Sequence, residues 1–502
     1  MINSITITNL DEVSLRVESE DSGILQEIHE HFSFMAPGYK FMPSYRNKMW
    51  DGRIRLFNLR NRVLPLGLKP HLISLCQERK YHVTEIHGHK GKNCIDSVHY
   101  IESLKLALKG DPITLRDYQL TASRRALESE RAVLVSPTGS GKSLIIYVLF
   151  RWFLSRPEAK GKKVIIIVPT TALVEQMYKD FEDYSAFDKD FEVKKDVHRI
   201  YSGKEKSSEA RVYVTTWQSA ITMPSMWFKQ FGAVFGDEAH LFKAVSLTKI
   251  MACLTDAWFR IGTTGTLPDS KESLVHTLVL EGCFGPVFNV TTTQALIESD
   301  TLAQLKINIL AMKYPEETRK ARGKQSYAEE IDFLVSHPRR NNFIANLAID
   351  QPGNTLVLFT LVEKHGKPLF ELIRKKAGPN RQVFFVSGSV SAEDRERIRS
   401  LVETEKNAMI IASTGVFSIG VNIKNLHNII IAAPTKSQVK LLQSIGRGLR
   451  KSDDGRPTTV FDLADDLTYK KNKNYTLKHG IDRLNIYKAE KFKFQVHEVP
   501  LS

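Results

Sequence analysis

Residues 136–143 have the types and the spacing of a loop that binds a phosphate chain. They read Ser-Pro-Thr-Gly-Ser-Gly-Lys-Ser and lie between a β-branched run and a helical pattern. Glycines let the backbone wrap closely around phosphates, and the N-terminus of the following helix adds unpaired N–H donors. We expect Lys142 to reach the β- and γ-phosphates and Ser143 to ligate Mg²⁺, although Ser136 replaces the usual first glycine. The expected nucleotide contacts in this loop are Pro137, Thr138, Gly139, Ser140, Gly141, Lys142 and Ser143.

A second segment, Asp237-Glu238-Ala239-His240, follows the apolar run Ala233–Gly236. Neighbouring residues at a strand end point in different directions, so each carboxylate can have its own task. We expect Asp237 to hold Mg²⁺ through its water shell and Glu238 to polarise the attacking water as general base. An acidic pair alone is commonly solvated surface. With the phosphate loop upstream, the pair predicts hydrolysis of a nucleoside triphosphate.

Two runs of alternating strands and helices must position these groups. The strands lack polar alternation, which is typical of a parallel sheet covered on both faces. The first run has expected strands at Ala132–Ser136, Val164–Val168, Arg211–Thr215, Ala233–Gly236 and Phe259–Gly262, with a helix at Thr171–Tyr184. After a polar segment, Tyr314–Glu330, the second has strands at Thr355–Thr360, Gln382–Val386, Ala408–Ala412 and Asn428–Ala432, with helices at Arg395–Glu403 and Lys436–Arg450.

The bulk properties indicate a protein with a polyanionic partner. The 502 residues exceed one ordinary core, and 71 Lys and Arg against 56 Asp and Glu give a formal charge of +15. Nucleic acid fits this excess, although charge alone is equally compatible with a basic surface that has no specific partner. Four cysteines without a close pair, no signal-peptide pattern and no membrane-spanning run predict a cytoplasmic protein, in the host cytoplasm if it is viral.

Residues 1–110 differ from the rest and predict a small α+β domain. Strands are expected at Ser4–Thr8 and Val13–Val17, and a helix at Ser22–Phe32. From Tyr39 to Arg62, cations interleave with aromatic side chains, a combination that can neutralise phosphates and stack on bases. The expected nucleic-acid contacts are Arg46, Lys48, Trp50, Arg53 and Arg55. The alternative, that the aromatics form a small core and the cations its solvated face, stays open.

The phosphate loop and the Asp-Glu-Ala-His segment together resemble a superfamily 2 helicase with a DEAH motif, over about residues 112–465. Leu115-Arg116-Asp117-Tyr118-Gln119 resembles the family's adenine-recognition element, which implies that Arg116, Tyr118 and Gln119 contact the nucleotide. Val168–Thr171 and Thr215–Gln218 resemble its strand-contacting loops, and Thr264-Gly265-Thr266 its coupling motif. The residues thereby implied in nucleic-acid binding are Pro169, Thr170, Thr215 and Thr216.

The later motifs of that family also have counterparts. Ser413–Val416 and Gly420–Ile423 resemble motif V, which implies that Thr414 contacts nucleic acid and Gly420 the nucleotide, with Asn422 where an Asp is common. Gln443–Arg450 resembles the arginine-finger motif. Arg447 and Arg450 share one helix face, and either could stabilise the transferred phosphoryl group, an effect of about 10³–10⁵ in rate in other NTPases. Read alone, they would be two surface arginines.

Two further segments, Tyr39–Tyr45 with Trp50–Leu56 and Leu477–Arg483, resemble the phage UvsW-type recombination helicases. The resemblance implies two RecA-like parallel-sheet α/β domains with an ATP cleft between them, preceded by a small α+β accessory domain. The expected domains are an accessory domain at 1–110, RecA-like domains at 111–298 and 299–468, and a basic extension at 469–502.

The implied activity is ATP- and Mg²⁺-dependent unwinding and branch migration of DNA. The substrates would be forks, Holliday junctions, displacement loops and R-loops with RNA–DNA hybrids, in recombination, replication and repair. We expect a monomer. An RNA helicase is the alternative, because the motor motifs alone do not exclude it. A binding module without turnover is disfavoured by the presence of Lys142, Glu238 and Arg450.

Overall fold

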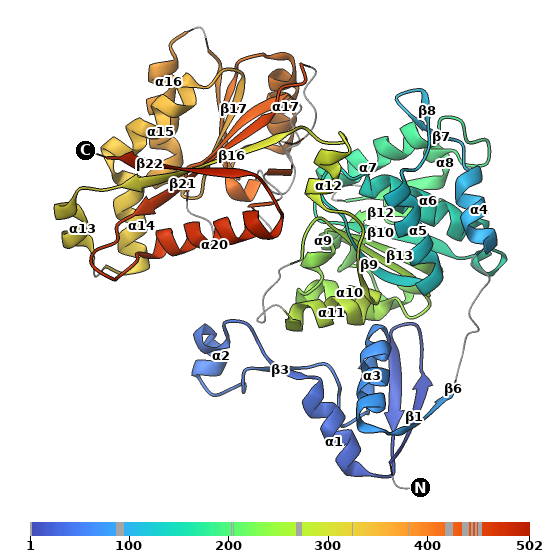
Figure 1. Cartoon of the computed structure of the whole chain (residues 1–502). Helices are drawn as coiled ribbons and strands as arrows, with labels where there is room; N and C mark the ends of the chain where they lie inside the picture. Colours follow the sequence, from blue (N-terminus) through green and yellow to red (C-terminus); the bar gives the residue numbers. More distant parts are fainter. Residues whose placement is uncertain are drawn as a thin grey trace. The chain divides into compact units, whose positions relative to one another are not determined.

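The structure is a computed structural model that divides into two compact units. The first unit comprises Met1–Ser136 with Gly141–Val290, and the second comprises Pro137–Ser140 with Thr291–Ser502. The described residues are 3–86, 95–201, 203, 205–267, 274–323, 325–379, 381–416, 425–433, 441–442, 445–446, 449 and 454–501. Figure 1 shows the chain coloured from blue at the N-terminus to red at the C-terminus.

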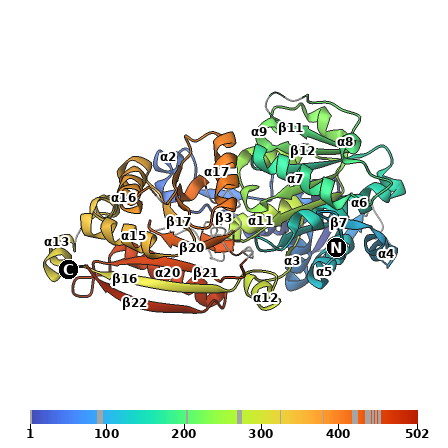
Figure 2. The same ribbon diagram turned by 90° about the horizontal axis from the view of Figure 1, so that it is seen from above.

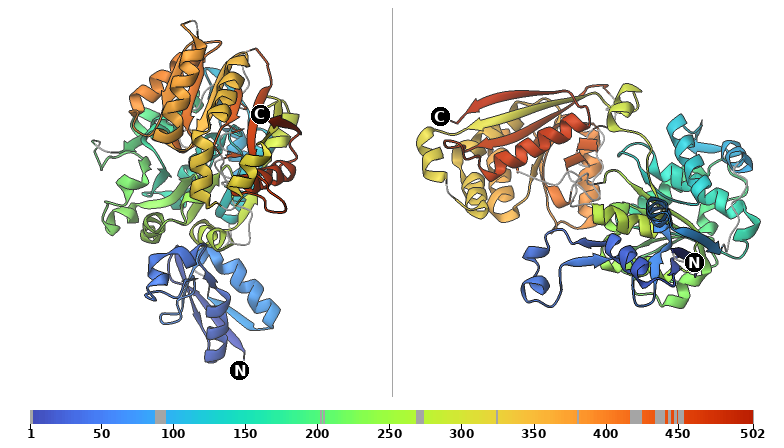
Figure 3. Two further views of the ribbon diagram at one scale, coloured as in Figure 1. Left: turned by 90° about the vertical axis from the view of Figure 1, so that its left-hand side faces the viewer. Right: turned by 60° about the horizontal axis from the view of Figure 1, so that its bottom comes forward.

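The first unit begins with a small α+β domain, drawn in blue in Figure 3. Its described strands form a sheet of order β5-β2-β1-β6, antiparallel except for the parallel pair β1–β6. Successive side chains of a strand point to opposite faces of the sheet. Alternate residues such as Ile5, Ile7, Leu15 and Val17 are therefore buried under the helices, and the residues between them face outward. The elements are β1 (Ser4–Asn9), β2 (Ser14–Glu18), α1 (Ser22–His31), β5 (Val63–Pro65), η2 (Leu66–Leu68), α3 (Lys69–Arg79) and β6 (His82–Ile86).

An arm, residues 33–55, projects from this sheet (Figures 1 and 3). Its strands β3 (Ser33–Met35) and β4 (Arg53–Arg55) pair antiparallel, and η1 (Tyr39–Phe41) and α2 (Pro43–Arg46) lie between them. Gly52 closes the turn at a φ of 81°, and a Cβ there would stand 2.7 Å from the Tyr39 ring. The tip of the arm therefore depends on glycine at this position.

The N-terminal domain is docked on the rest of the first unit by buried charges and backbone. Arg131 donates to the Glu12 backbone oxygen at 2.6 Å and to its carboxylate at 2.9 Å, and Arg260 donates to the same backbone oxygen at 3.4 Å. Burial lowers the pKa of Arg260 to about 9. At a second point, Gly67 lies so close to the Glu281 carbonyl that an added Cβ would be 1.9 Å away.

The remainder of the first unit is a parallel sheet with helices on its faces, as expected. In the described residues its strand order is β11-β12-β10-β13-β14-β9-β15. The strands are β7 (Leu106–Leu108), β8 (Asp111–Ile113), β9 (Arg131–Val135), β10 (Lys163–Val168), β11 (Val197–Ile200), β12 (Val212–Thr216), β13 (Phe231–Asp237), β14 (Phe259–Thr264) and β15 (Val287–Asn289), with β7 and β8 forming a separate hairpin. The helices are α4 (Ile95–Ser103), α5 (Asp117–Ser129), α6 (Lys142–Ser155), α7 (Thr171–Tyr184), α8 (Val193–Asp196), α9 (Trp217–Ala220), α10 (Val245–Cys253) and α11 (Leu274–Phe284), with shorter turns η3 (Pro157–Ala159), η4 (Ser225–Gln230) and η5 (Ala239–Leu241).

The second unit is another parallel sheet, of order β18-β19-β17-β20-β21-β16-β22 among its described strands. Figure 2 shows β16, β21 and β22 side by side with α20. The strands are β16 (Leu305–Lys313), β17 (Asn354–Phe359), β18 (Val383–Val386), β19 (Met409–Ser413), β20 (Leu426–Ile431), β21 (Thr458–Asp466) and β22 (Phe494–Pro500). The helices are α12 (Thr293–Glu298), α13 (Glu316–Arg322), α14 (Tyr327–Ser336), α15 (Pro338–Asp350), the π-turn η7 (Val362–Gly366), α16 (Lys367–Ala377), α17 (Ala392–Thr404) and α20 (Tyr475–Ala489). Residues 469–502, expected as a basic extension, thus supply a helix and a strand of this sheet.

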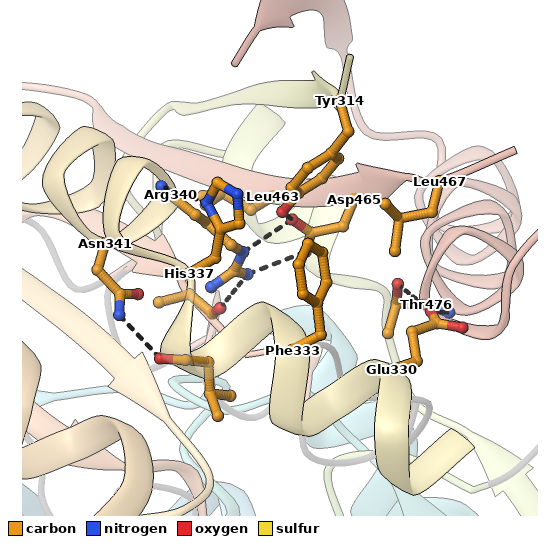
Figure 4. A network of polar contacts seen from close by, with 12 residues as sticks. Tyr314, Glu330, Phe333, His337, Arg340, Asn341, Leu463, Asp465, Leu467 and Thr476 are labelled. Atoms are coloured by element: carbon orange, nitrogen blue, oxygen red, sulfur yellow. Dashed lines mark hydrogen bonds and ion pairs between the residues drawn. The ribbon is translucent and has the colours of Figure 1, made fainter. Parts of the chain in front are cut away.

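Two buried carboxylates hold the end of β21 and the start of α20 against the rest of this unit (Figure 4). Asp465, at the end of β21, accepts from Arg340 Nε at 2.7 Å, from Arg340 Nη2 at 2.9 Å and from Tyr314 Oη at 2.8 Å. Glu330 accepts from the backbone N–H of Thr476 at 2.7 Å and from its hydroxyl at 2.6 Å, at the start of α20. Each buried carboxylate accepts several hydrogen bonds, and these offset the cost of burying its charge.

Both parallel sheets and the small N-terminal α+β domain confirm the predicted fold class. Among the described helices, none combines the length and the apolar character that a membrane span requires.

Candidate nucleotide site and nucleic-acid contacts

The phosphate loop leaves β9 at Val135 and enters α6 at Lys142. Gly139 and Gly141 have φ of 84° and 81°, the left-handed region in which glycine has no steric cost. A hydrogen bond ties the loop to β14, the neighbour of β9 in the sheet, because the Ser136 N–H donates to the Thr264 carbonyl at 2.8 Å. The Ser140 N–H donates back to the Pro137 carbonyl at 3.2 Å. The two glycines and these two hydrogen bonds hold the loop in a curved conformation.

The lysine and the serine of the loop have partners inside the first unit. Lys142 Nζ donates to the Ser136 carbonyl at 3.2 Å, which folds its side chain back over the loop. Ser143 Oγ lies 3.0 Å from Tyr184 Oη, at the end of α7. The sequence reasoning missed this tyrosine, because nothing in either segment signals a contact between residues 41 positions apart.

The expected adenine element lies against the same loop. Gln119 is 3% exposed, and its Oε1 accepts from the Arg116 N–H at 3.0 Å at the start of α5. A Cβ on Gly141 would stand 2.5 Å from Gln119 Nε2, so the amide packs directly on the phosphate loop. Arg116 Nη1 donates to Tyr118 Oη at 3.1 Å. Gln119 thus lies against the loop, while Arg116 bonds to Gln119 and Tyr118 at the start of α5.

Asp237 ends the central strand β13 and is buried at its carboxyl end. Its Oδ1 accepts from Thr263 Oγ1 at 2.9 Å on the neighbouring strand β14. Burial raises the pKa of Asp237 above its ordinary value and the charge of Glu238 adds to this, whereas Lys142 acts in the opposite direction. Ser136 of the phosphate loop bonds to Thr264 and Asp237 bonds to Thr263, so both motifs lie at the same end of β14.

Glu238 adopts a left-handed conformation, with a φ of 52° that is unusual for a residue with a side chain. Such strain persists only where the surroundings enforce it, and it clusters at functional sites. His240 Nδ1 lies 3.3 Å from Glu238 Oε2 and 3.0 Å from Thr264 Oγ1. His240 therefore joins the acidic pair to the end of β14, from which the Thr264-Gly265-Thr266 segment continues.

The residues present fit a magnesium ion. Mg²⁺ takes oxygen ligands and is usually held by one or two protein groups, with waters and substrate phosphates completing its coordination. The Ser143 hydroxyl and the Asp237 carboxylate are such groups, and Asp237 is a buried carboxylate whose charge has a cost without a cation nearby. In the described part of the chain, no cluster of three or more His, Cys, Asp or Glu offers a complete protein cage.

The expected nucleic-acid contacts of the first sheet lie at the carboxyl ends of β10 and β12. Pro169 and Thr170 are half-buried, and Thr170 Oγ1 caps α7 by accepting from the Leu173 N–H at 3.3 Å. Thr215 and Thr216 are 0% and 4% exposed, and Thr216 caps α9. The threonine hydroxyls form hydrogen bonds within the protein, and the contacts of these four residues with nucleic acid stay a prediction.

The arm presents exposed cations around the half-buried rings of Tyr39, Tyr45 and Trp50 and the exposed ring of Phe41. Arg46, Lys48 and Arg53 are exposed, whereas Arg55 is ion-paired with Asp51. The Arg55 hydrogen bond lowers the pKa of Asp51 to about 2. Trp50 Nε1 donates to the Arg53 carbonyl at 2.9 Å, which fixes the indole against the turn.

In the second unit, Thr414 directly follows β19 and is 7% exposed. Gly420, Arg447 and Arg450 lie outside the described residues, and their roles stay predictions.

Three family models match consecutive parts of the chain. They are the N-terminal domain of the DNA helicase UvsW at residues 4–85, the res subunit of type III restriction enzymes at 112–269 and the helicase conserved C-terminal domain at 339–452. Over 97% of this chain and 98% of the relative, the sequence is 37% identical to the ATP-dependent DNA helicase uvsW of Enterobacteria phage T4. It is 26% identical to a DNA 3'-5' translocase of Sulfurisphaera tokodaii, over 70% of this chain and 82% of that one.

The fold agrees with this relationship. The crystal structure of T4 UvsW matches with a TM-score of 0.51 at 34% identity, covering 99% of this chain and 100% of the other. The phosphate loop, the acidic pair and the small N-terminal domain all lie within matched regions. This chain therefore belongs to the UvsW-type family of superfamily 2 ATP-dependent DNA helicases.

Proposed function

We propose that this helicase unwinds and branch-migrates branched DNA, including forks, Holliday junctions, displacement loops and R-loops. The observation that carries the proposal is that the phosphate loop and the Asp237–Glu238 pair meet at one end of β14, in a chain that also matches the N-terminal domain of UvsW. The full-length similarity to a phage DNA helicase supports it further. Recombination-dependent replication and repair are the processes in which such junctions arise.

The proposal gives each site residue a role in ATP hydrolysis. Lys142 neutralises charge on the β- and γ-phosphates, and Ser143 with Asp237 would hold Mg²⁺, which supplies charge stabilisation on the transferred phosphoryl group. Glu238, in its strained backbone conformation, orients and deprotonates the attacking water. His240 connects this carboxylate to Thr264. A movement of Glu238 during hydrolysis would therefore be transmitted to the segment that follows β14. Arg447 or Arg450 would supply the arginine finger, and Gly420 a further nucleotide contact.

The arm is the proposed junction-binding element of the N-terminal domain. Arg46, Lys48 and Arg53 are exposed and can neutralise phosphates, and Trp50 offers a partly exposed ring beside them. Arg55 can contribute once its pairing with Asp51 is exchanged for a phosphate. The proposed domain arrangement is the accessory domain at 1–110, RecA-like domains at 111–298 and 299–468, and the basic segment at 469–502.

ATP-dependent strand separation on a panel of labelled substrates tests the proposal. The panel comprises forks, four-way junctions, RNA–DNA hybrids and duplex RNA, and Lys142→Ala is the matched variant without turnover. We expect activity on the DNA junctions that Lys142→Ala abolishes. Activity confined to RNA, or ATP hydrolysis stimulated by RNA and not by single-stranded DNA, would replace the proposal by an RNA helicase.

A further inference from the structure

We infer that the second unit carries an additional DNA-binding face at the carboxyl ends of β16 and β21. The face, here called the lysine turn, is formed by the exposed Lys470, Lys471, Lys473 and Lys478 around the turn that follows β21. It binds the phosphate backbone of duplex DNA next to the junction, without reading its sequence. The inference rests on the proposed action on DNA junctions.

The charge of this segment is one-sided. Between Leu467 and Lys493 there are eight Lys and Arg against two acids, Asp482 and Glu490. Arg483 is buried and paired with Asp462 at 2.7 Å, so it belongs to the core of the unit. Within the part of the chain that the structure describes, none of the four lysines of the lysine turn forms an ion pair. Their charge is therefore available to an external anion.

The lysine turn is held rigidly by buried contacts. Asn474 Nδ2 donates to Glu330 Oε1 at 2.8 Å and to the Asp465 carbonyl at 3.0 Å, and its Oδ1 accepts from the Leu467 N–H at 3.0 Å. Glu330 is 1% exposed and holds the start of α20 through Thr476, as Figure 4 shows. Tyr469 and Asn472 form a bridge across the turn itself. A surface fixed in this way loses little conformational entropy when it binds.

The aromatic rings of this face contact the lysines and are not free to stack on bases. Lys470 lies over the Tyr469 ring at 5.7 Å and Lys478 over the Tyr475 ring at 5.6 Å. Tyr475 in turn packs edge-on against Tyr327, with ring centroids 5.9 Å apart. Rings engaged with each other and with lysines are poorly placed to stack on nucleotides. The chemistry of the face therefore suits phosphates, which every DNA sequence presents alike.

The position of the lysine turn agrees with a continuous DNA path. In this parallel sheet, β19 and β21 are separated by β17 and β20, and their carboxyl ends lie on one edge. At a spacing of about 4.8 Å between strands, Thr414 after β19 and Leu467 after β21 are about 14 Å apart along that edge. Along the axis of a DNA duplex, each strand carries one phosphate per about 3.4 Å, so the interval corresponds to about four base pairs. A DNA held at Thr414 thus reaches the lysine turn.

The test replaces Lys470, Lys471 and Lys473 together by glutamine in the full chain. The matched control replaces Arg374, Lys375 and Lys376 by glutamine, because these exposed side chains on α16 carry the same charge in the same unit. Affinity for a labelled duplex and for a labelled single strand is measured without ATP at several salt concentrations. We expect the lysine-turn variant to bind duplex about tenfold or more weakly, and the slope of log affinity against log salt to fall by about 2–3, at about 0.9 per lost phosphate contact.

Equal effects of the two triple variants would overturn the inference, and so would a loss confined to the single strand. Unchanged DNA affinity with loss of binding to an acidic protein would overturn it as well, in favour of a protein partner. Since this affinity is measured without turnover, it is independent of strand separation, whose absence in the unchanged chain would instead refute the proposed function. Unchanged ATP hydrolysis without DNA shows that the triple variant is folded.

Discussion

We predict that breaking the buried pair of Arg340 and Asp465 lowers the free energy of unfolding of the second unit and leaves that of the first unit unchanged. Both side chains are 1% exposed or less, and Asp465 accepts the three hydrogen bonds described above. Asp465→Asn keeps the shape but removes the negative charge, and its amide nitrogen cannot accept from the guanidinium. Arg340 is then left as a buried cation without its counter-charge. Breaking a buried pair in this way costs about 3–5 kcal/mol of folding free energy.

The matched control is Asp332→Asn. Asp332 pairs with Lys364 at 2.8 Å in the same unit, but the two side chains are 55% and 62% exposed. Exposed pairs contribute about 0–1 kcal/mol, so this variant should unfold almost as the unchanged protein does. The comparison therefore separates the effect of burial from the effect of losing one carboxylate.

The assay uses the distribution of tryptophan. The five tryptophans, Trp50, Trp152, Trp217, Trp227 and Trp258, all lie in the first unit. Denaturant unfolding followed by far-ultraviolet circular dichroism reports both units, whereas tryptophan emission reports the first. For Asp465→Asn, we expect an early transition in circular dichroism that the tryptophan signal does not share. Coincident shifts of both signals, or equal unfolding of the Asp465 and Asp332 variants, would refute the reasoning.

Three further predictions concern the first unit. Glu238→Gln should lower the rate of ATP hydrolysis by about 10²–10⁴ while nucleotide binding persists, and hydrolysis near the original rate would remove Glu238 as the base. Gly67→Ala should lower the thermal unfolding midpoint, because the added Cβ would stand 1.9 Å from the Glu281 carbonyl, whereas Gly388→Ala, with nothing within 4 Å, is the control. The hydrogen bond to Glu281 raises the pKa of His71, so an NMR titration should show a value above that of ordinary histidine that Glu281→Gln reduces. Because the folded value exceeds the unfolded one, this contact stabilises the docked domain below the unfolded pKa and its contribution is lost as pH rises through the folded pKa.

Locally determined features could be predicted from the sequence. The helix at Thr171–Tyr184 has the predicted bounds, because its apolar spacing and its Thr170 cap are encoded in neighbouring residues. The parallel sheets were also predictable, since buried strands without polar alternation are unlike the strands of an exposed sheet. The phosphate loop is a single segment whose glycines fix its own curvature.

Features that depend on distant pairing could not be predicted. The strand β22 is an edge strand with mostly exposed residues, and it exists because Phe494 to Pro500 pair with Ile307 to Lys313, almost two hundred positions earlier. Charged residues such as Arg340 and Asp465 are usually surface residues, and only their mutual contact permits their burial. The contact of Ser143 with Tyr184 is of the same kind, since helix α7 brings it about rather than any local pattern.

The docking of the N-terminal domain has a mechanical consequence. Arg131 is the first residue of β9 and Arg260 the second of β14, and both hold the backbone of Glu12. The opposite ends of the same two strands carry Ser136 and Thr263, at the phosphate site. Extended chain resists stretching, and five residues span about 16 Å. A force on the N-terminal domain is therefore transmitted along β9 and β14 to the phosphate site. Tension on bound DNA can in this way change the rate of ATP hydrolysis.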